Sequence, residues 1–209
     1  MSFPIKLLSS PEDFAGEHEM IAAMFSAGLP CLHLRKPGHS YESLQRWLLA
    51  LEAEWRPFVI VHGHPDLALG MGLAGCHMPL EWLRQGHHEK GVHAEITRWS
   101  VSLHNLEELR SCPAGISDAF LSPIFDSLSK PGYPAAFSAQ ELQAALLLDH
   151  ARRQVGPAVY ALGGIEVQNL GMAAEWGFAG AAVLGAVWNA PDPVGALEEI
   201  LVSAKAIHV

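Results

Sequence analysis

Cysteine, clustered basic residues and long apolar runs are all scarce in this sequence, and each scarcity excludes a class of protein. The 209 residues include 3 cysteines, Cys31, Cys76 and Cys112, without paired spacing, so we predict neither a disulfide framework nor a zinc ribbon. Thirteen lysines and arginines against 22 aspartates and glutamates give a net charge of −9. Because the basic residues form no block, we expect no nucleic-acid and no anionic-membrane partner. No segment approaches the roughly 18 apolar residues of a membrane span, and we expect a cytoplasmic protein.

Apolar residues and histidines are what the sequence has in excess. Half of the residues are hydrophobic and 17% are charged, below the roughly 25% charged residues of typical soluble domains. This balance predicts a large buried core. The 12 histidines nearly equal the 13 lysines and arginines together, and their purpose is the question that the motifs must answer.

Short apolar runs alternate with longer helical patterns along the whole chain. The predicted strands are Ile5–Leu8, Cys31–Leu34, Phe58–Val61, Gly75–Met78, Trp99–Leu103, Ala119–Leu121, Val159–Leu162 and Ala181–Leu184. The predicted helices are Glu17–Ala27, Tyr41–Trp55 with Ser40 as N-cap, a short helix from Pro65, Leu80–Arg84, Leu106–Arg110, Ala139–Gln154, Val167–Trp176 and Val194–Ala206. Eight units of about 26 residues favour a (β/α)8 barrel, one domain over residues 1–209. An open doubly wound sheet, the alternative, more often has five or six units.

The second predicted strand ends in the motif Leu-His-Leu-Arg-Lys-Pro-Gly, where barrels place reactive groups. Alternation along the strand puts Cys31, His33 and Arg35 on one face, away from the leucines between them. An inward arginine at a strand end predicts a substrate phosphate, since its fork suits phosphate oxygens. A structural ion pair is the alternative. The adjacent Lys36 is either a second anion contact or a solvated loop lysine.

The loop after the sixth predicted strand, residues 122–137, brings hydroxyls and an ammonium together. Ser127, Ser129 and Lys130 lie within four residues of one another, and such groups can donate several hydrogen bonds to a phosphate or pyrophosphate. The same residue types also occur in any exposed loop, so this motif predicts little by itself.

Glycines follow the last two predicted strands. Gly163 and Gly164 come after the seventh strand and Gly185 after the eighth, the two loops where many barrels bind phosphate through backbone N–H groups. Glycine permits close backbone approach and positive φ. The alternative is that these glycines merely turn the chain.

Four histidines, His33, His62, His77 and His104, lie at or just past the ends of the second to fifth predicted strands, with His64 close by. Imidazoles that converge on one mouth can contact substrate, transfer protons or bind a transition metal. We favour substrate contact or proton transfer over a metal. For the remaining histidines we expect ordinary surface positions: His18, His39, His87, His88, His93, His150 and His208.

Taken in order, the motifs LHLRK, VHGHPDLAL, GCHMP, WSVSLHNLEEL, LSPIFDSLSK, YALGGI and GFAGAAVLGAVW resemble the thiamine phosphate synthase family, including its TenI-type relatives, from about Leu32 to Trp188. The resemblance implies a (β/α)8 enzyme. Family synthases join hydroxymethylpyrimidine pyrophosphate to a thiazole phosphate and release pyrophosphate with the help of Mg²⁺. TenI-type members bind the thiazole phosphate, and some tautomerise the thiazole carboxylate.

The resemblance also implies roles for individual residues. Arg35 matches the arginine of the family's Gln-Leu-Arg-x-Lys, with His33 at the glutamine position, and His62 stands at an asparagine position. Pyrophosphate and phosphate binding falls to Arg35, Ser127, Ser129, Lys130, Gly163, Gly164 and Gly185. The catalytic candidates are Arg35, Lys130, His33, His62 and His104, and the substrate pocket includes His77 and Ser102.

The sequence departs from the family pattern at the metal. The two aspartate positions for Mg²⁺ correspond to Gly63 and Trp82, so the cation depends on replacement by Asp66 or Glu81, and we assign no metal ligand. The tautomerase histidine is also missing, because Ser122 and Pro123 occupy that stretch.

Four functions follow, in order of preference: a thiamine phosphate synthase, a TenI-like tautomerase, a non-catalytic binder of thiazole phosphate or thiamine phosphate, and a hydrolase with a transition metal on the histidines. The expected partners are small phosphorylated thiazole and pyrimidine substrates, with a homodimer as the expected assembly.

Overall fold

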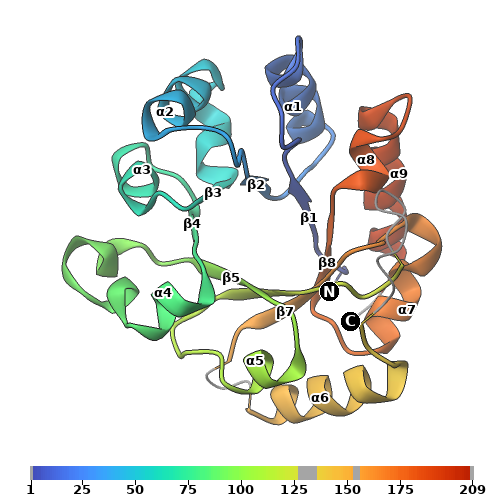
Figure 1. Cartoon of the computed structure of the whole chain (residues 1–209). Helices are drawn as coiled ribbons and strands as arrows, with labels where there is room; N and C mark the ends of the chain where they lie inside the picture. Colours follow the sequence, from blue (N-terminus) through green and yellow to red (C-terminus); the bar gives the residue numbers. More distant parts are fainter. Residues whose placement is uncertain (1, 127–135, 153–155, 208–209) are drawn as a thin grey trace.

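Eight parallel strands close a barrel in chain order, as a computed structural model of the protein shows for residues 2–126, 136–152 and 156–207 (Figure 1). The strands are β1 Ile5–Leu8, β2 Leu32–Leu34, β3 Val59–His62, β4 Gly75–His77, β5 Trp99–Leu103, β6 Asp118–Leu121, β7 Ala158–Leu162 and β8 Gly180–Val183. Pairing of β1 with β8 completes the ring. The predicted (β/α)8 barrel is confirmed, and each predicted strand agrees with an observed one to within a residue or two.

Helices surround the barrel on the outside (Figure 1). They are α1 Glu17–Ser26, α2 Tyr41–Ala50, α3 Pro65–Gly70, α4 Leu80–Arg84, α5 Leu106–Arg110, α6 Ala139–Arg152, α7 Leu170–Glu175, α8 Gly185–Trp188 and α9 Pro193–Ala206, with 3₁₀ turns at Ala53–Phe58, His87–Glu89, Gly91–Glu95 and Val167–Asn169. Side-chain caps start four of the described helices, at Ser40, Asn105, Ser138 and Asp192, where a side-chain oxygen accepts a backbone N–H three residues on.

The second helix is shorter than its periodicity predicts. It ends at Ala50 rather than Trp55, because Leu51 is extended. The guanidinium of Arg56 accounts for this end: it donates to the carbonyl oxygens of Leu48 at 3.0 Å and Leu51 at 3.1 Å. Those carbonyls have no partner within the helix, so a downstream side chain caps the helix, and the chain continues as a 3₁₀ turn.

Two apolar layers form because strand residues alternate between the two faces of the barrel wall. Outward residues such as Leu32, Leu34 and Val61 belong to the large core between barrel and helices. A second, small cluster of Leu8, Phe120, Tyr160 and Ala182 lies in the barrel interior. Since this inner cluster is small, the interior has room for polar side chains.

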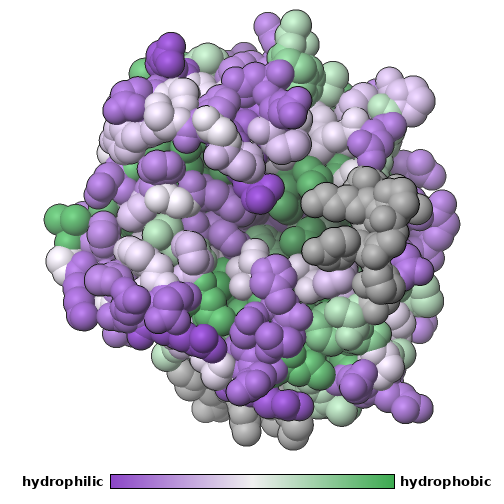
Figure 2. Space-filling view, viewed as in Figure 1, coloured by the Kyte–Doolittle hydropathy of each residue, from purple (hydrophilic) through white to green (hydrophobic). Residues whose placement is uncertain are grey.

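The mouth of the barrel lies at the carboxyl ends of the strands. Viewed as in Figure 1, hydrophobic atoms are exposed near the centre of one face, with hydrophilic side chains around them (Figure 2). Within the described residues, no helix is long and apolar enough to cross a membrane.

Candidate active site at the mouth of the barrel

A pocket of about 830 Å³ opens at the carboxyl ends of the strands. This volume lies in the range of small-molecule sites, roughly 300–1,000 Å³. Residues from all eight strands or their following loops line it, including Leu8, Arg35, His62, His77, Ser102, His104, Phe120, Ser122, Gly163, Gly164, Ala182 and Gly185. The pocket therefore brings together, on one surface, most of the described residues that the sequence nominated.

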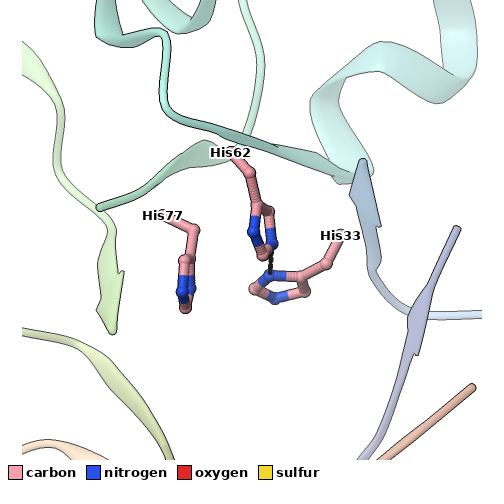
Figure 3. Close-up of side chains that lie close together, drawn as sticks. All are labelled: His33, His62 and His77. Carbon is pink, nitrogen blue, oxygen red and sulfur yellow. Dashed lines mark hydrogen bonds between the residues drawn. The ribbon is translucent and has the colours of Figure 1, made fainter. Parts of the chain in front are cut away.

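Three histidines from neighbouring strands lie close together at this pocket, which two of them line. His33 of β2, His62 of β3 and His77 of β4 direct their imidazoles toward one another (Figure 3). His33 Nδ1 and His62 Nε2 share a hydrogen bond of 3.2 Å. The rings of His62 and His77 stack with centroids 4.0 Å apart. We call His33, His62 and His77 the histidine cluster.

Burial keeps the histidine cluster neutral. Loss of solvation holds the pKa of His33 and of His62 well below 6.5, and the adjacent imidazoles lower both further. Burial, followed by the positive charge of Arg35, lowers the pKa of His77 to about 3. A general base works best with a pKa near the working pH, so at neutral pH these rings serve as hydrogen-bonding groups or metal ligands better than as bases.

Serines of β5 fix the ring of His77. Its Nδ1 lies 2.9 Å from Ser100 Oγ and its Nε2 lies 3.1 Å from Ser102 Oγ. Phe120 of β6 stacks on the same ring at 5.7 Å and meets His33 edge-on at 4.7 Å. Sequence reasoning nominated Ser102 but missed Ser100 and Phe120, although both occupy inward positions of predicted strands.

Arg35 and Lys36 are neighbours with opposite surroundings. Arg35 is exposed at the pocket, and no described residue forms an ion pair or hydrogen bond with its guanidinium. Ser9, which the sequence did not single out, holds the Arg35 backbone with bonds of 2.9 and 3.1 Å. A free guanidinium on a pocket wall fits the anion-binding role predicted for Arg35.

Lys36 is neither an anion contact nor a solvated lysine. Its side chain is buried and its Nζ lies 2.6 Å from Glu17 Oε1 and 3.1 Å from Asp13 Oδ1. Trp47 Nε1 donates to the same Glu17 carboxylate at 3.1 Å. Lys36 therefore ties α1 to the loop after β2, through a contact between residues far apart in sequence.

The two glycines after β7 turn the chain and also meet the loop after β6. Gly163 and Gly164 have φ of +93° and +64°, in the region that side chains with a Cβ avoid. A Cβ on Gly164 would lie 2.8 Å from Phe125 Cβ and would collide with the carbonyl oxygen of Asp126. The predicted alternative, a turning role, is thus real, and both glycines still line the pocket.

Asn169 fixes the same turn from its other side, and sequence reasoning missed it. Its Nδ2 donates to Gly164 O at 2.7 Å, and its Oδ1 accepts from Glu166 N at 2.9 Å. The backbone after β7 is consequently held before any ligand enters.

The remaining nominated residues have mixed outcomes. His104 is exposed at the pocket, and its backbone N–H donates to Glu108 at 2.7 Å. Gly185 begins α8 on the pocket wall. Ser127, Ser129 and Lys130 lie outside the described residues, as does His208. The expected surface position is wrong for His88, which is 4% exposed and packs against Trp99.

The described residues do not fit a Mg²⁺ site. Mg²⁺ prefers carboxylate oxygens and retained waters. Among the described residues lining the pocket, the carboxylate is that of Glu108, which accepts the N–H of His104. Asp66 is exposed and lies 3.6 Å from His93, and Glu81 is exposed outside the pocket lining. Neither replaces the aspartates that the resemblance implies.

Comparison with known proteins identifies the family. The model of the family described as thiamine monophosphate synthase matches residues 7–187. The chain belongs to this family. A thiamine-phosphate synthase of Thermus thermophilus is 30% identical over 147 residues, which cover 70% of this chain and 67% of that protein. The resemblance of the motifs is therefore confirmed.

Other family members resemble the chain over most of its length. A thiamine-phosphate synthase of Thermosynechococcus vestitus is 28% identical over 88% of this chain, which spans about half (51%) of that relative's length. The crystal structure of a thiamine phosphate pyrophosphorylase from Bacteroides thetaiotaomicron matches with a TM-score of 0.79 and 26% identity, covering 99% of this chain and 100% of that one.

Proposed function

We propose that this member of the thiamine monophosphate synthase family joins hydroxymethylpyrimidine pyrophosphate to a thiazole phosphate and releases pyrophosphate. One observation carries the proposal. The guanidinium of Arg35 after β2 and the glycine loops after β7 and β8 line the same pocket, on strands that β1 separates in the barrel order. Such a pocket can hold two anionic groups apart and leave the space between them for two ring systems.

The described residues suggest a division of labour. Arg35 binds the pyrophosphate and stabilises the charge that develops as it leaves, and the sequence adds Ser127, Ser129 and Lys130 to this role. The backbone of Gly163, Gly164 and Gly185 binds the thiazole phosphate. The apolar surfaces of Leu8, Met78 and Phe120 accept the rings. The substrates are accordingly small phosphorylated molecules.

The histidine cluster makes the tautomerase the weaker candidate. A tautomerase must remove a proton at neutral pH, and a His77 pKa of about 3 makes a poor base for that task. His39, His64 and His104 are the pocket-lining histidines outside the cluster. A tautomerase would therefore depend on one of these three histidines, and substitution of each in turn distinguishes the two reactions.

The test uses purified protein with both precursors and detects thiamine phosphate by chromatography. The assay is run with Mg²⁺, with Zn²⁺ and with a chelator, because the described residues do not select Mg²⁺. We expect product in at least one metal condition and a loss of turnover of about tenfold or more in Arg35→Gln, since a hydrogen bond to a charged group contributes about 1.5–3 kcal/mol.

Other outcomes would overturn the proposal in distinct ways. Binding of thiazole phosphate by calorimetry without turnover in any condition would indicate a binder. Interconversion of thiazole tautomers that His39→Ala, His64→Ala or His104→Ala abolishes would indicate the tautomerase. The predicted homodimer is a separate proposal, which light scattering of the purified protein tests.

A further inference from the structure

We propose that His33, His62 and His77 bind one divalent cation of the zinc class, with an open coordination position toward the pocket. Within the described part of the chain, these side chains form a group whose ligand atoms all lie within 4.8 Å of one another. Figure 3 shows the three imidazoles close together on three adjacent strands, with the rings of His62 and His77 stacked and His33 hydrogen-bonded to His62. The inference does not depend on the proposed synthase reaction, since its readout is metal binding.

Strand register places the three rings. His62 of β3 is paired with His77 of β4, and His33 of β2 is paired with Ile60, two residues before His62. All three are inward positions, so their side chains extend into one small volume of the barrel. The cation site thus rests on the rigid wall of the barrel rather than on loops, as a precise metal site requires.

The distances suit a tetrahedral ion. Zinc–nitrogen bonds of about 2.0–2.1 Å place two histidine ligands roughly 3.3 Å apart. His33 Nδ1 and His62 Nε2 are 3.2 Å apart, close to that separation. The ligand nitrogen of His77 lies within 4.8 Å of the other two, so a side-chain movement of about 1.5 Å brings it to the same spacing.

Burial leaves the rings ready to coordinate. A metal ligand must be an unprotonated imidazole, and all three rings are neutral at pH 7 because burial lowers their pKa values. His33 is 0% exposed, and its Nε2 has no hydrogen-bond partner among the described residues. The nitrogen that faces His62 is Nδ1, so cation binding leaves Nε2 as the protonated nitrogen of His33.

Ser100 supplies a contact that metal-bound histidines usually have. Such rings commonly donate their second N–H to an oxygen, which fixes the ring orientation. Ser100 Oγ lies 2.9 Å from His77 Nδ1, while Ser102 Oγ lies 3.1 Å from Nε2. If the cation displaces Ser102 from Nε2, Ser100 remains as the positioning residue.

The open position follows from the pocket. His62 and His77 line the pocket and His33 does not. A cation among them has three protein ligands and one side facing the pocket, the arrangement in which three-histidine zinc sites keep a water or substrate oxygen. Imidazole ligands select zinc-class ions over Mg²⁺, which prefers oxygen.

The experiment measures metal directly on the full chain, purified without a histidine tag and stripped with a chelator. After equilibration with Zn²⁺ and dialysis, elemental analysis should find one zinc per chain, and excess Mg²⁺ should not displace it. Co²⁺ then serves as the spectroscopic probe, because tetrahedral Co²⁺ absorbs strongly in the visible region. No stoichiometric zinc, or a Co²⁺ spectrum of octahedral type, would overturn the proposal.

Two variants of similar size remove ligands without removing volume. His33→Gln and His62→Asn should each weaken zinc binding by at least about a hundredfold, the upper end of the cost of losing a mere supporting contact. Ser100→Ala should weaken it about tenfold. Thermal melting confirms that the variants fold.

His104→Ala is the matched control, since it removes another pocket histidine outside the cluster. Its zinc affinity should equal that of the unmodified chain. Zinc that survives both ligand variants, or that is lost equally in His104→Ala, would place the metal elsewhere and end the proposal.

Discussion

Polar side chains are buried at both ends of the barrel interior, as paired charges at one end and as neutral rings at the other. At the amino ends of the strands, Lys6 of β1 lies 2.6 Å from Asp118 of β6, and Arg98 donates to the same carboxylate at 2.9 Å. At the carboxyl ends, the histidine cluster has no carboxylate among the described residues that form it. Buried charges are therefore paired at the amino ends of the strands, and the buried rings at the carboxyl ends are uncharged.

This difference assigns stability to the amino ends of the strands and ligand binding to the carboxyl ends. Burial lowers the pKa of Lys6, and the Asp118 charge opposes that shift. The ammonium also lies 3.9 Å from the centre of the Tyr160 ring. In this lower group of Lys6, Asp118 and Arg98, the first two side chains are therefore enclosed, and the Arg98 side chain is 36% exposed. Two rings of the histidine cluster line an open pocket, which leaves the cluster capable of binding. In barrels, the carboxyl ends of the strands carry activity and the opposite face carries stability.

The largest effect should come from breaking the lower group. Asp118→Asn removes the charge that pairs with both Lys6 and Arg98. Removal of one partner of a buried pair costs about 3–5 kcal/mol, because the other charge stays buried. Urea unfolding should show a loss of that size. Asp66→Asn, at an exposed carboxylate, is the control and should change stability by less than about 0.5 kcal/mol.

Lys6→Met sharpens the same comparison. It removes one cation but leaves Arg98 beside Asp118, so its cost should be smaller than that of Asp118→Asn. Equal costs would mean that Arg98 does not stabilise the carboxylate and that the lower group is a single pair.

The second-largest effect should come from acid, which destabilises the folded protein by protonating the histidine cluster. The pKa of His77 is about 3 in the folded protein and about 6.5 when unfolded, so the unfolded chain binds the proton more tightly. Stability is therefore complete above pH 6.5 and falls as the pH drops toward 3. From pH 7 to pH 5, His77 alone should cost about 2 kcal/mol, and His33 and His62 add to this in the same direction.

Metal-free protein in urea, titrated over this pH range, measures the effect. Replacement of His77 by Asn should flatten the acid side of the curve. A profile that is flat between pH 7 and pH 5 in the unmodified chain would show that the cluster is not buried in neutral form.

A smaller effect is expected from the loop after β7, at the carboxyl ends of the strands. Gly164→Ala puts a Cβ at φ +64° and against Phe125 and Asp126, with a backbone cost of about 1–2 kcal/mol. Gly171→Ala is the matched control, since nothing lies within 4 Å of a Cβ there and the residue is helical. Thermal melts should show loss at Gly164 and no loss at Gly171. Equal melting temperatures would remove the argument for a tightly held loop.

Local patterns predicted most of the fold. Strands β1 and β5 and helices α4 and α5 have the predicted bounds, because alternation, caps and turn residues act within a few positions. The end of α2 was mispredicted because the side chain of Arg56 caps it from outside the helix. Periodicity carries no information about such a contact.

Long-range contacts limited the prediction of the site. Strand ends placed His33, His62 and His77 at one mouth, but the 3.2 Å contact between His33 and His62 depends on register. Lys36 was mispredicted because its partner Glu17 lies in α1, 19 residues away in the sequence. Ser9 and Asn169 were missed because each acts on the backbone of a distant or turning segment.

Arg35 should show the smallest effect on stability and a clear effect on binding. Its guanidinium is exposed and has no described partner, so Arg35→Gln should leave the free energy of unfolding unchanged within about 0.5 kcal/mol. The same substitution should weaken binding of inorganic pyrophosphate by about tenfold or more, since charged hydrogen bonds contribute about 1.5–3 kcal/mol. Arg110→Gln, at an exposed arginine of α5 outside the pocket lining, should change neither quantity. Arg35→Gln should change binding without changing stability, whereas Asp118→Asn should change stability. Calorimetry and urea unfolding of both variants therefore test whether the carboxyl ends of the strands bind ligand and the amino ends stabilise the fold.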